Sequence, residues 1–213
     1  MDINPLLETG LIQISGFPEF SGMQRADFKS FMSQSAALLE KTRDVIDSAS
    51  LERAIDYVLA AISKGHPILV CGNGGSASDA AHITGELVGK FLKERRPLNA
   101  ISLSANTSIL TAWANDYEFE SVYARQVEAH GQAHGVLIAL STSGTSKNIV
   151  QAAKTARDIG MKVVSLTGEG GGALANHSDV LLAVPSTSTP LIQQVHLCLY
   201  HYLCAEIEAR CFA

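Results

Sequence analysis

The chain has 213 residues, of which 46% are apolar and 17% charged, and its formal net charge is −5. This length predicts one domain with additional helices, and the apolar share excludes an intrinsically disordered chain. Typical globular domains have about 25% charged residues, so the low share here indicates a surface partly covered by other copies of the chain. An acidic chain without a long Lys/Arg run also argues against a nucleic-acid partner.

Nothing in the sequence predicts a secreted or membrane-bound protein. The four cysteines form neither a CxxC pair nor a framework typical of secreted proteins. The N-terminus lacks a basic segment with an apolar run behind it, and no window reaches the length of a membrane span. We therefore expect a cytoplasmic protein with reduced thiols.

The predicted elements begin with an N-terminal arm over residues 1–25, whose scattered apolar side chains are expected to pack on a partner. Helical periodicity predicts helices over 26–46 and 51–63. From there on, short apolar strands alternate with helices. Strands are predicted at 67–71, 99–103, 136–140, 161–166 and 180–184, with helices between them that end near residues 90, 114 and 159.

Continuous apolar strands that alternate with helices are typical of a parallel sheet covered on both faces. With right-handed crossovers, this pattern predicts an α/β fold over residues 26–213: a three-layer, doubly wound sandwich with a five-stranded parallel sheet and added N-terminal helices. A last helix over 190–208 is apolar around most of its circumference. Such a helix is buried, and at a chain terminus we expect its burial between subunits.

Two loops that follow strands carry the small residues that suit a bound phosphate. Ligands of doubly wound sheets bind at the carboxyl ends of the strands. The first loop, residues 71–76, reads Cys-Gly-Asn-Gly-Gly-Ser, so its backbone can approach a ligand closely. It matches a dinucleotide-binding motif only formally, because the next strand ends without an acidic residue, and we expect no nucleotide cofactor. A tight turn without a ligand is the alternative.

The second loop, residues 141–146, reads Ser-Thr-Ser-Gly-Thr-Ser and precedes a helix. Five hydroxyl groups at one strand end are typical of a site for a phosphate monoester. The alternative, an ordinary capped helix start, needs only one hydroxyl. No Walker lysine follows, which argues against nucleotide hydrolysis.

Four polar side chains near these loops could carry the chemistry. His82 and Glu86 lie on one helix face, as a structural pair, a metal half-site, or a base with its orienting group. Gln193 and His201 lie on the apolar last helix, where polar groups need partners. Eight residues span about 12 Å along a helix axis, so one metal ion would not reach both. Either the helix starts after Gln193 or the site joins two subunits, and we favour the interface.

At these residues the sequence resembles the phosphoheptose isomerases of the sugar isomerase (SIS) family. The resemblance is carried by 71–76 with His82 and Glu86, by 114–117, 141–146 and 166–172, and by Ile192 and Gln193 with His196 and His201. It implies a flavodoxin-like SIS fold and the conversion of sedoheptulose 7-phosphate to D-glycero-D-manno-heptose 7-phosphate. This reaction is the first step of nucleotide-activated heptose synthesis for lipopolysaccharide or another surface glycan. A homotetramer with sites between subunits, and one zinc ion per subunit, are also implied.

The resemblance also implies roles for single residues. The implied substrate-binding residues are Asn73, Gly74, Gly75, Ser76, Glu86, Asn115, Asp116, Ser141, Thr142, Ser143, Ser146 and Gln193. The implied zinc ligands are His82, Glu86, Gln193 and His201. An aldose–ketose isomerase moves a proton between C1 and C2 through an enediol-type intermediate, for which Glu86 suits the base and His201 the acid. The sequence leaves open whether Glu86 is the base or only a metal ligand.

Two other functions stay open at this point. The family contains a relative that binds the replication initiator DnaA and does not isomerise sugars, and we expect its catalytic set to be incomplete. An isomerase or sensor of a hexose or pentose phosphate would need a shorter distance from the phosphate loop to Glu86. The site, not the fold, distinguishes these functions.

Overall fold

The computed structural model describes residues 27–212, so the predicted arm over 1–25 lies outside the described residues. Five strands form one sheet in the order β2-β1-β3-β4-β5, and each neighbouring pair is parallel. The strands are β1 (Ile68–Cys71), β2 (Ala100–Ser102), β3 (Val136–Ser141), β4 (Lys162–Thr167) and β5 (Val180–Ala183). The predicted doubly wound sheet is confirmed, with the flavodoxin-like strand order.

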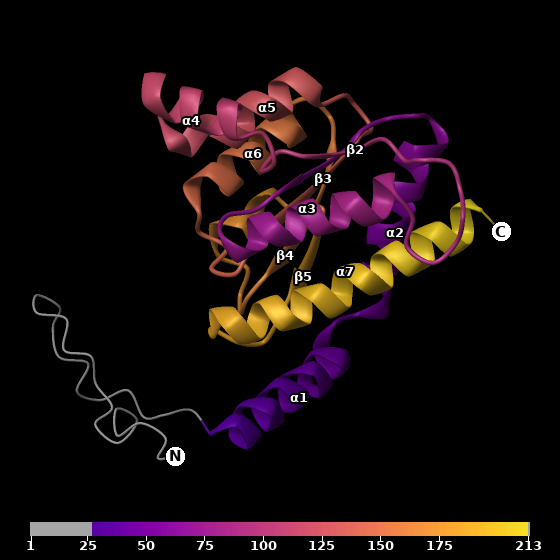
Figure 1. Cartoon of the computed structure of the whole chain (residues 1–213), viewed down its shortest axis with the longest axis vertical. Helices are drawn as coiled ribbons and strands as arrows, with labels where there is room; N and C mark the ends of the chain where they lie inside the picture. Colours follow the sequence, from indigo (N-terminus) through magenta and orange to yellow (C-terminus); the bar gives the residue numbers. More distant parts are fainter. Residues whose placement is uncertain (1–26, 213) are drawn as a thin grey trace, which may run out of the picture.

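Helices cover both faces of this sheet, which gives three layers (Figure 1). The helices of the described chain are α1 (Phe28–Val45), α2 (Ser48–Ser63), α3 (Gly75–Val88), α4 (Thr107–Asp116), α5 (Val122–His130), α6 (Lys147–Asp158) and α7 (Thr189–Cys211), with the short 3-10 helices η2 (Phe119–Ser121) and η3 (Gly172–His177). On one face α2, α3 and α7 share a core with the sheet, and on the other α5 and α6 do so. No helix in this part of the chain is long and apolar enough to span a membrane.

Most strand positions are apolar because the side chains of each strand alternate between two buried faces. In β1, Ile68 and Val70 join the core under α2, α3 and α7, whereas Leu69 and Cys71 join the core under α5 and α6. Parallel sheets are covered on both faces, which explains why the strands read as continuous apolar runs.

Two details differ from the prediction. The Asp47 carboxylate accepts hydrogen bonds from the backbone of Ala49 and Ser50, so α2 starts at Ser48, three residues earlier than predicted. The helix α5 lies in a stretch for which the sequence pattern predicted no element. Its residues Val122 and Val127 are fully buried in the second core. We attribute the omission to its nine-residue length, which is too short for a clear period.

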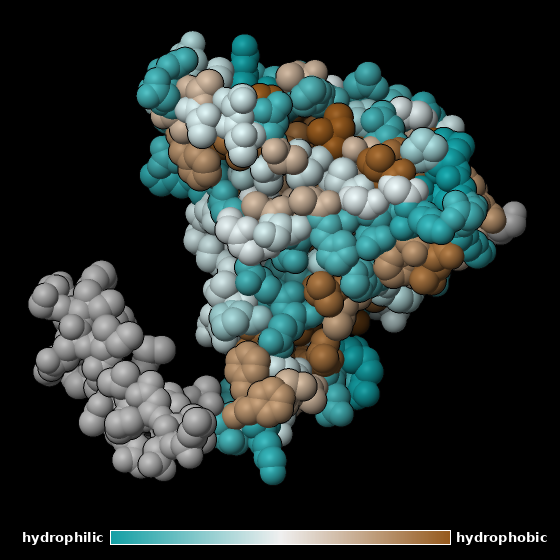
Figure 2. Space-filling model, viewed as in Figure 1, coloured by the Kyte–Doolittle hydropathy of each residue, from teal (hydrophilic) through white to brown (hydrophobic). Residues whose placement is uncertain are grey.

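The helix α1 lies outside the sandwich and packs against α7 (Figure 1). Apolar side chains remain exposed over α1 (Figure 2), among them Phe28 at 73% and Met32 at 52%. The predicted last helix is confirmed as α7, which packs against α1, α2 and α3 within the same chain. Its Leu197 and Tyr202 nevertheless stay partly exposed.

Candidate active site

The two predicted loops meet where the strand order of the sheet reverses. The strand β1 pairs with both β2 and β3, and the chain leaves β1 and β3 toward opposite sides. Ligands of such sheets bind in the crevice at this point. An open pocket with a volume of about 290 Å³ lies there, lined by Asn73, Gly74, Gly75, Ser76, Leu140, Ser141, Thr142, Ser146, Thr189 and Gln193.

Three long helices begin at this pocket. Gly75 starts α3, Ser146 precedes α6, and Thr189 starts α7. In none of the three does the side chain of the residue before the helix bond its first turn; in α6, Asn148 Oδ1 accepts from the backbone N–H of Ile149 at 3.0 Å. Uncapped first turns present free N–H groups and the positive end of the helix dipole, which together bind anions. The pocket can therefore hold a phosphate even though no Lys or Arg lines it.

The hydroxyl-rich loop is not an ordinary helix cap. Ser146 occupies the position before α6, but its Oγ bonds the Oγ of Ser141 at 3.2 Å and not the helix backbone. Ser143 is exposed, and its Oγ accepts from the backbone N–H of Thr145 within the same loop at 3.2 Å. Ser141, Thr142 and Ser146 line the pocket, whereas Ser143 does not. The arrangement favours the phosphate interpretation over the capping alternative.

The glycine-rich turn after β4 supports this loop from behind. Gly144 has a φ of +65°, and a Cβ there would lie 2.1 Å from the carbonyl oxygen of Gly171. The backbone N–H of Gly168 also donates to the carbonyl of Thr142 at 3.0 Å. Only glycine permits this close approach of two backbones.

A pair of amides joins the first loop to α6. The side chains of Asn73 and Asn148 exchange hydrogen bonds of 2.8 and 2.9 Å. Asn148 is buried, and it had not been singled out in the sequence because it lies 75 residues from Asn73. Thr189 was missed as well, although it ends a second hydroxyl-rich segment, residues 186–189, that follows β5. The amide pair fixes the distance between the two loops.

His82, Glu86 and His201 form a second group, on α3 and α7. The Nε2 of His82 lies 3.0 Å from the Oε1 of Glu86 and 3.4 Å from the Nε2 of His201. One donor atom from each of the three residues lies within 4.8 Å of the others. Imidazole nitrogens and a carboxylate oxygen are ligands that zinc prefers, so this set fits a zinc ion.

The tyrosine behind His82 sets the orientation of its ring. The Nδ1 of His82 lies 2.9 Å from the hydroxyl of Tyr200, and that hydroxyl donates to Asp79 at 3.4 Å. A proton on Nδ1 then leaves Nε2 free to face Glu86 and His201. Burial raises the pKa of both Asp79 and Tyr200.

Gln193 lies apart from this group within one chain. The helix α7 starts at Thr189, which rules out the alternative that it begins after Gln193. The Gln193 amide faces α3 at Gly75, where a Cβ would lie 2.6 Å from its Nε2, and the residue lines the phosphate pocket. His201 is two turns further along, about 12 Å away on the helix axis.

Other predicted residues have different surroundings. Asn115 and Asp116 end α4, are exposed and hydrogen-bonded to each other at 2.8 Å, and do not line the pocket. His196 is fully buried, and its Nε2 lies 3.1 Å from the carbonyl of Thr167. Burial lowers the pKa of His196 to about 4, so this histidine is a neutral core residue at neutral pH.

Comparisons with known proteins point to one family. The family model for the SIS domain matches residues 30–168. A phosphoheptose isomerase from Rhodospirillum rubrum is 48% identical over 159 residues, 75% of this chain and 85% of its own length. One from Helicobacter pylori is 47% identical over 180 residues, 84% of this chain and 93% of its own. The solved structure of phosphoheptose isomerase from Neisseria gonorrhoeae is 37% identical, with a TM-score of 0.80 over 85% of this chain and 96% of that one.

Proposed function

Because the chain belongs to the phosphoheptose isomerases of the SIS domain family, we propose that it interconverts sedoheptulose 7-phosphate and D-glycero-D-manno-heptose 7-phosphate. The observation that carries this proposal is the meeting of His82, Glu86 and His201, from two separate helices, within 4.8 Å. A family member that only binds a partner would have no use for this complete set. The product would enter nucleotide-activated heptose synthesis in the cytoplasm, for lipopolysaccharide or another surface glycan.

The phosphate of the substrate binds in the pocket between β1 and β3, at the point where the strand order of the sheet reverses. The hydroxyls of Ser141, Thr142 and Ser146 and the first turns of α3, α6 and α7 donate to its oxygens. Hydrogen bonds to an ionised phosphate are shorter and stronger than those between neutral groups. The cradle thus holds one end of the sugar, and it leaves the carbonyl end to the second group of residues.

Glu86 removes a proton from C1 of the ketose, which forms an enediol. The protonated carboxyl exchanges this proton with solvent and then delivers a proton to C2, which collapses the enediol to the aldose. His201 donates a proton to the carbonyl oxygen and takes one from the neighbouring hydroxyl. His82 lies 3.0 Å from Glu86, with its own ring fixed by Tyr200, so a metal ion bound by both side chains would hold Glu86 in place. A zinc ion held by His82, Glu86 and His201 would polarise the carbonyl as a Lewis acid.

We propose that the complete site is shared with a second copy of the chain. Glu86 lies eleven residues after Gly75, which places the two about 16 Å apart along α3. A fully extended seven-carbon sugar phosphate spans roughly 10 Å from C1 to phosphorus, because each of its eight bonds of about 1.5 Å advances only about 1.25 Å along the zigzag. A cradle from one subunit next to the His82–Glu86–His201 group of a neighbour removes this mismatch. It would also let Gln193 of one copy meet the zinc ligands of another, as a homotetramer with interfacial sites requires.

The experiment that tests the function is turnover on a panel of ketose phosphates with five, six and seven carbons. We expect kcat/KM to be highest for sedoheptulose 7-phosphate, by at least a factor of ten. Verified removal of metal with a chelator should abolish activity, and added zinc should restore it. A preference for a shorter sugar, or no turnover of any, would overturn the proposed function, and full activity without metal would remove the catalytic zinc.

A further inference from the structure

A buried ion pair joins the end of α3 to α7. Arg95 belongs to the loop after α3, and Glu208 lies near the end of α7. Their side chains are 1% and 3% exposed, and the Nε of Arg95 lies 3.0 Å from the Oε2 of Glu208. In the sequence, residues 93–96 are only a short charged cluster, whose function the proposed reaction does not explain.

Glu208 also binds the backbone of the loop that follows α3. Glu208 accepts hydrogen bonds of 2.9, 2.7 and 2.6 Å from the backbone N–H groups of Phe91, Leu92 and Lys93. Burial would raise the pKa of Glu208, but these bonds and Arg95 lower it overall, so the carboxylate stays ionised. The loop is thus held against α7 along its length.

Arg95 in turn caps the end of α3. Its guanidinium donates to the carbonyl of Glu86 at 2.6 Å and to that of Leu87 at 2.9 Å. The last turn of a helix leaves such carbonyls unpaired, and a buried end needs partners for them. One of the two carbonyls belongs to the residue that carries the base, so Arg95 fixes the backbone of Glu86 directly.

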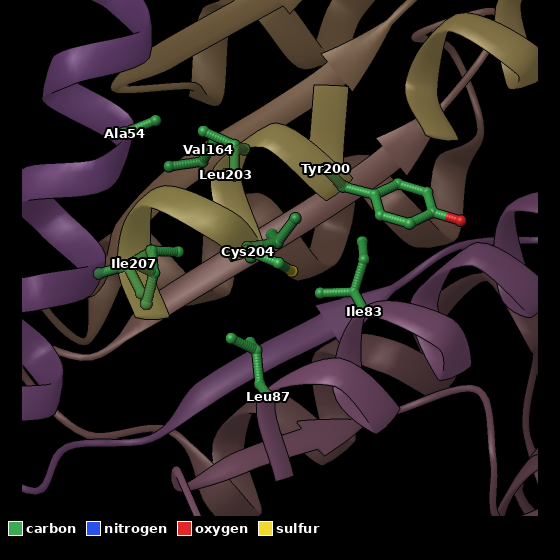
Figure 3. Close-up of a pocket in the computed structure, with 10 residues that line it drawn as sticks. Ala54, Ile83, Leu87, Val164, Tyr200, Leu203, Cys204 and Ile207 are labelled. Atoms are coloured by element: carbon green, nitrogen blue, oxygen red, sulfur yellow. The ribbon is translucent and has the colours of Figure 1, made fainter. Parts of the chain in front are cut away.

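Apolar packing between α3 and α7 leaves a gap next to this junction. A small cavity of about 10 Å³ lies there, at the lower limit for a single water molecule. Figure 3 shows Ile83 and Leu87 of α3 on one side and Leu203, Cys204 and Ile207 of α7 on the other. Side chains that face a void lack contact atoms on that side, so apolar packing leaves part of the contact between the two helices unfilled.

We propose that Arg95 and Glu208 are positioning residues that hold α3 and α7 at the spacing at which Glu86 and His201 share one site. The loop that they pin also places the Phe91 ring 5.4 Å from the ring of His201. This inference rests on the proposed function, since it concerns the geometry of the same three residues. The ion pair then contributes to zinc affinity and to kcat as well as to the stability of the fold.

The test is the double variant R95Q/E208Q, which removes both charges and leaves no buried ion unpaired. Zinc affinity is measured by competition with a chromogenic chelator, and kcat and KM with sedoheptulose 7-phosphate. We expect a folded protein by circular dichroism, with zinc affinity weakened about 10-fold to 100-fold. We expect kcat to fall at least tenfold and KM to stay within threefold, because the phosphate cradle lies at the other end of α3.

The matched control is Arg210→Gln, which breaks an exposed ion pair between the same helix and Glu52 of α2. We expect its zinc affinity and kcat to stay within twofold of the parent.

If the double variant does not fold, Glu208→Asp replaces it, with the same pattern expected. Unchanged zinc affinity and kcat in the folded variant, or an equal loss in the control, would overturn the inference. A parent chain that neither binds zinc nor turns over would overturn this inference and the proposed function together, whereas an active parent with unaffected variants overturns the inference alone.

Discussion

At the scale of single residues, the proposed reaction depends on Glu86 as its base. Its side chain is 21% exposed, so Glu86→Gln should fold normally. Loss of the base should lower kcat by about 100-fold to 10,000-fold, the usual contribution of general acid–base catalysis. Initial rates with sedoheptulose 7-phosphate measure the effect, and thermal unfolding verifies the fold.

The control is Glu94→Gln, which removes an exposed carboxylate on the loop after α3 and should leave kcat unchanged. Near-normal turnover of Glu86→Gln would remove Glu86 from the base role.

The buried His196 should make the free energy of unfolding depend on pH. Its pKa falls from 6.5 to about 4 on folding because burial disfavours the charged ring. Between these values the unfolded chain binds a proton that the folded chain does not, so stability decreases as the pH is lowered through this window. The loss reaches about 3 kcal/mol near pH 4, at about 1.4 kcal/mol per pKa unit.

Urea unfolding between pH 7 and 4 measures this dependence. His196→Gln has no titrating ring and should show a flatter curve over the window, whereas His130→Gln, at an exposed position, should retain the parental slope. Parental pH dependence in His196→Gln would show that other groups cause the loss.

Single residues also show what sequence reasoning could and could not find. The glycine and hydroxyl loops follow strands, and the carboxyl ends of parallel strands converge, so their meeting was predictable. Asn148, Arg95 and Glu208 act through partners far away in the sequence, 75 residues for Asn148 and 113 for the ion pair. No local pattern marks such residues, because a buried polar group is recognisable only once its partner is known.

At the scale of elements, the phosphate loop depends on the turn that supports it. Gly144 and Gly170 both have positive φ, of +65° and +75°, so an alanine costs about 1–2 kcal/mol of backbone strain at either position. Only at Gly144 would the Cβ also clash, with Gly171, whereas nothing lies within 4 Å at Gly170. Gly144→Ala should therefore raise KM for the phosphosugar at least tenfold, and Gly170→Ala should leave KM near the parental value.

Steady-state kinetics on both variants, with urea unfolding alongside, separates strain from displacement of the loop. Equal KM values for the two variants would show that the contact between Gly144 and Gly171 does not shape the phosphate pocket.

The elements that periodicity identified are those with long or strongly apolar patterns. The strands and α7 were predicted to within a few residues because apolar side chains dominate their patterns. The short helix α5 has a second feature that obscures its pattern, because its buried face includes the polar Gln126, which bonds the carbonyl of Leu103. Such a satisfied polar group does not resemble a core position in the sequence.

At the scale of the whole molecule, the separation between cradle and base predicts shared sites. Glu86→Gln lacks the base, and a Ser141→Ala/Ser146→Ala double variant lacks cradle hydroxyls, so each alone should be nearly inactive. Co-refolded in equal amounts, they should regain about a quarter of parental activity, because one site in four then draws both intact parts from different subunits. No recovery in verified mixed oligomers would place cradle and base in the same subunit.

The most direct measurement of the central claim is isotope exchange during turnover in D2O, followed by NMR of the product. Proton transfer through an enediol with Glu86 as the base predicts deuterium at C2 of D-glycero-D-manno-heptose 7-phosphate, and Glu86→Gln should lose exchange and turnover together. Product that carries no deuterium, or exchange that continues at the parental rate in Glu86→Gln, would contradict the account.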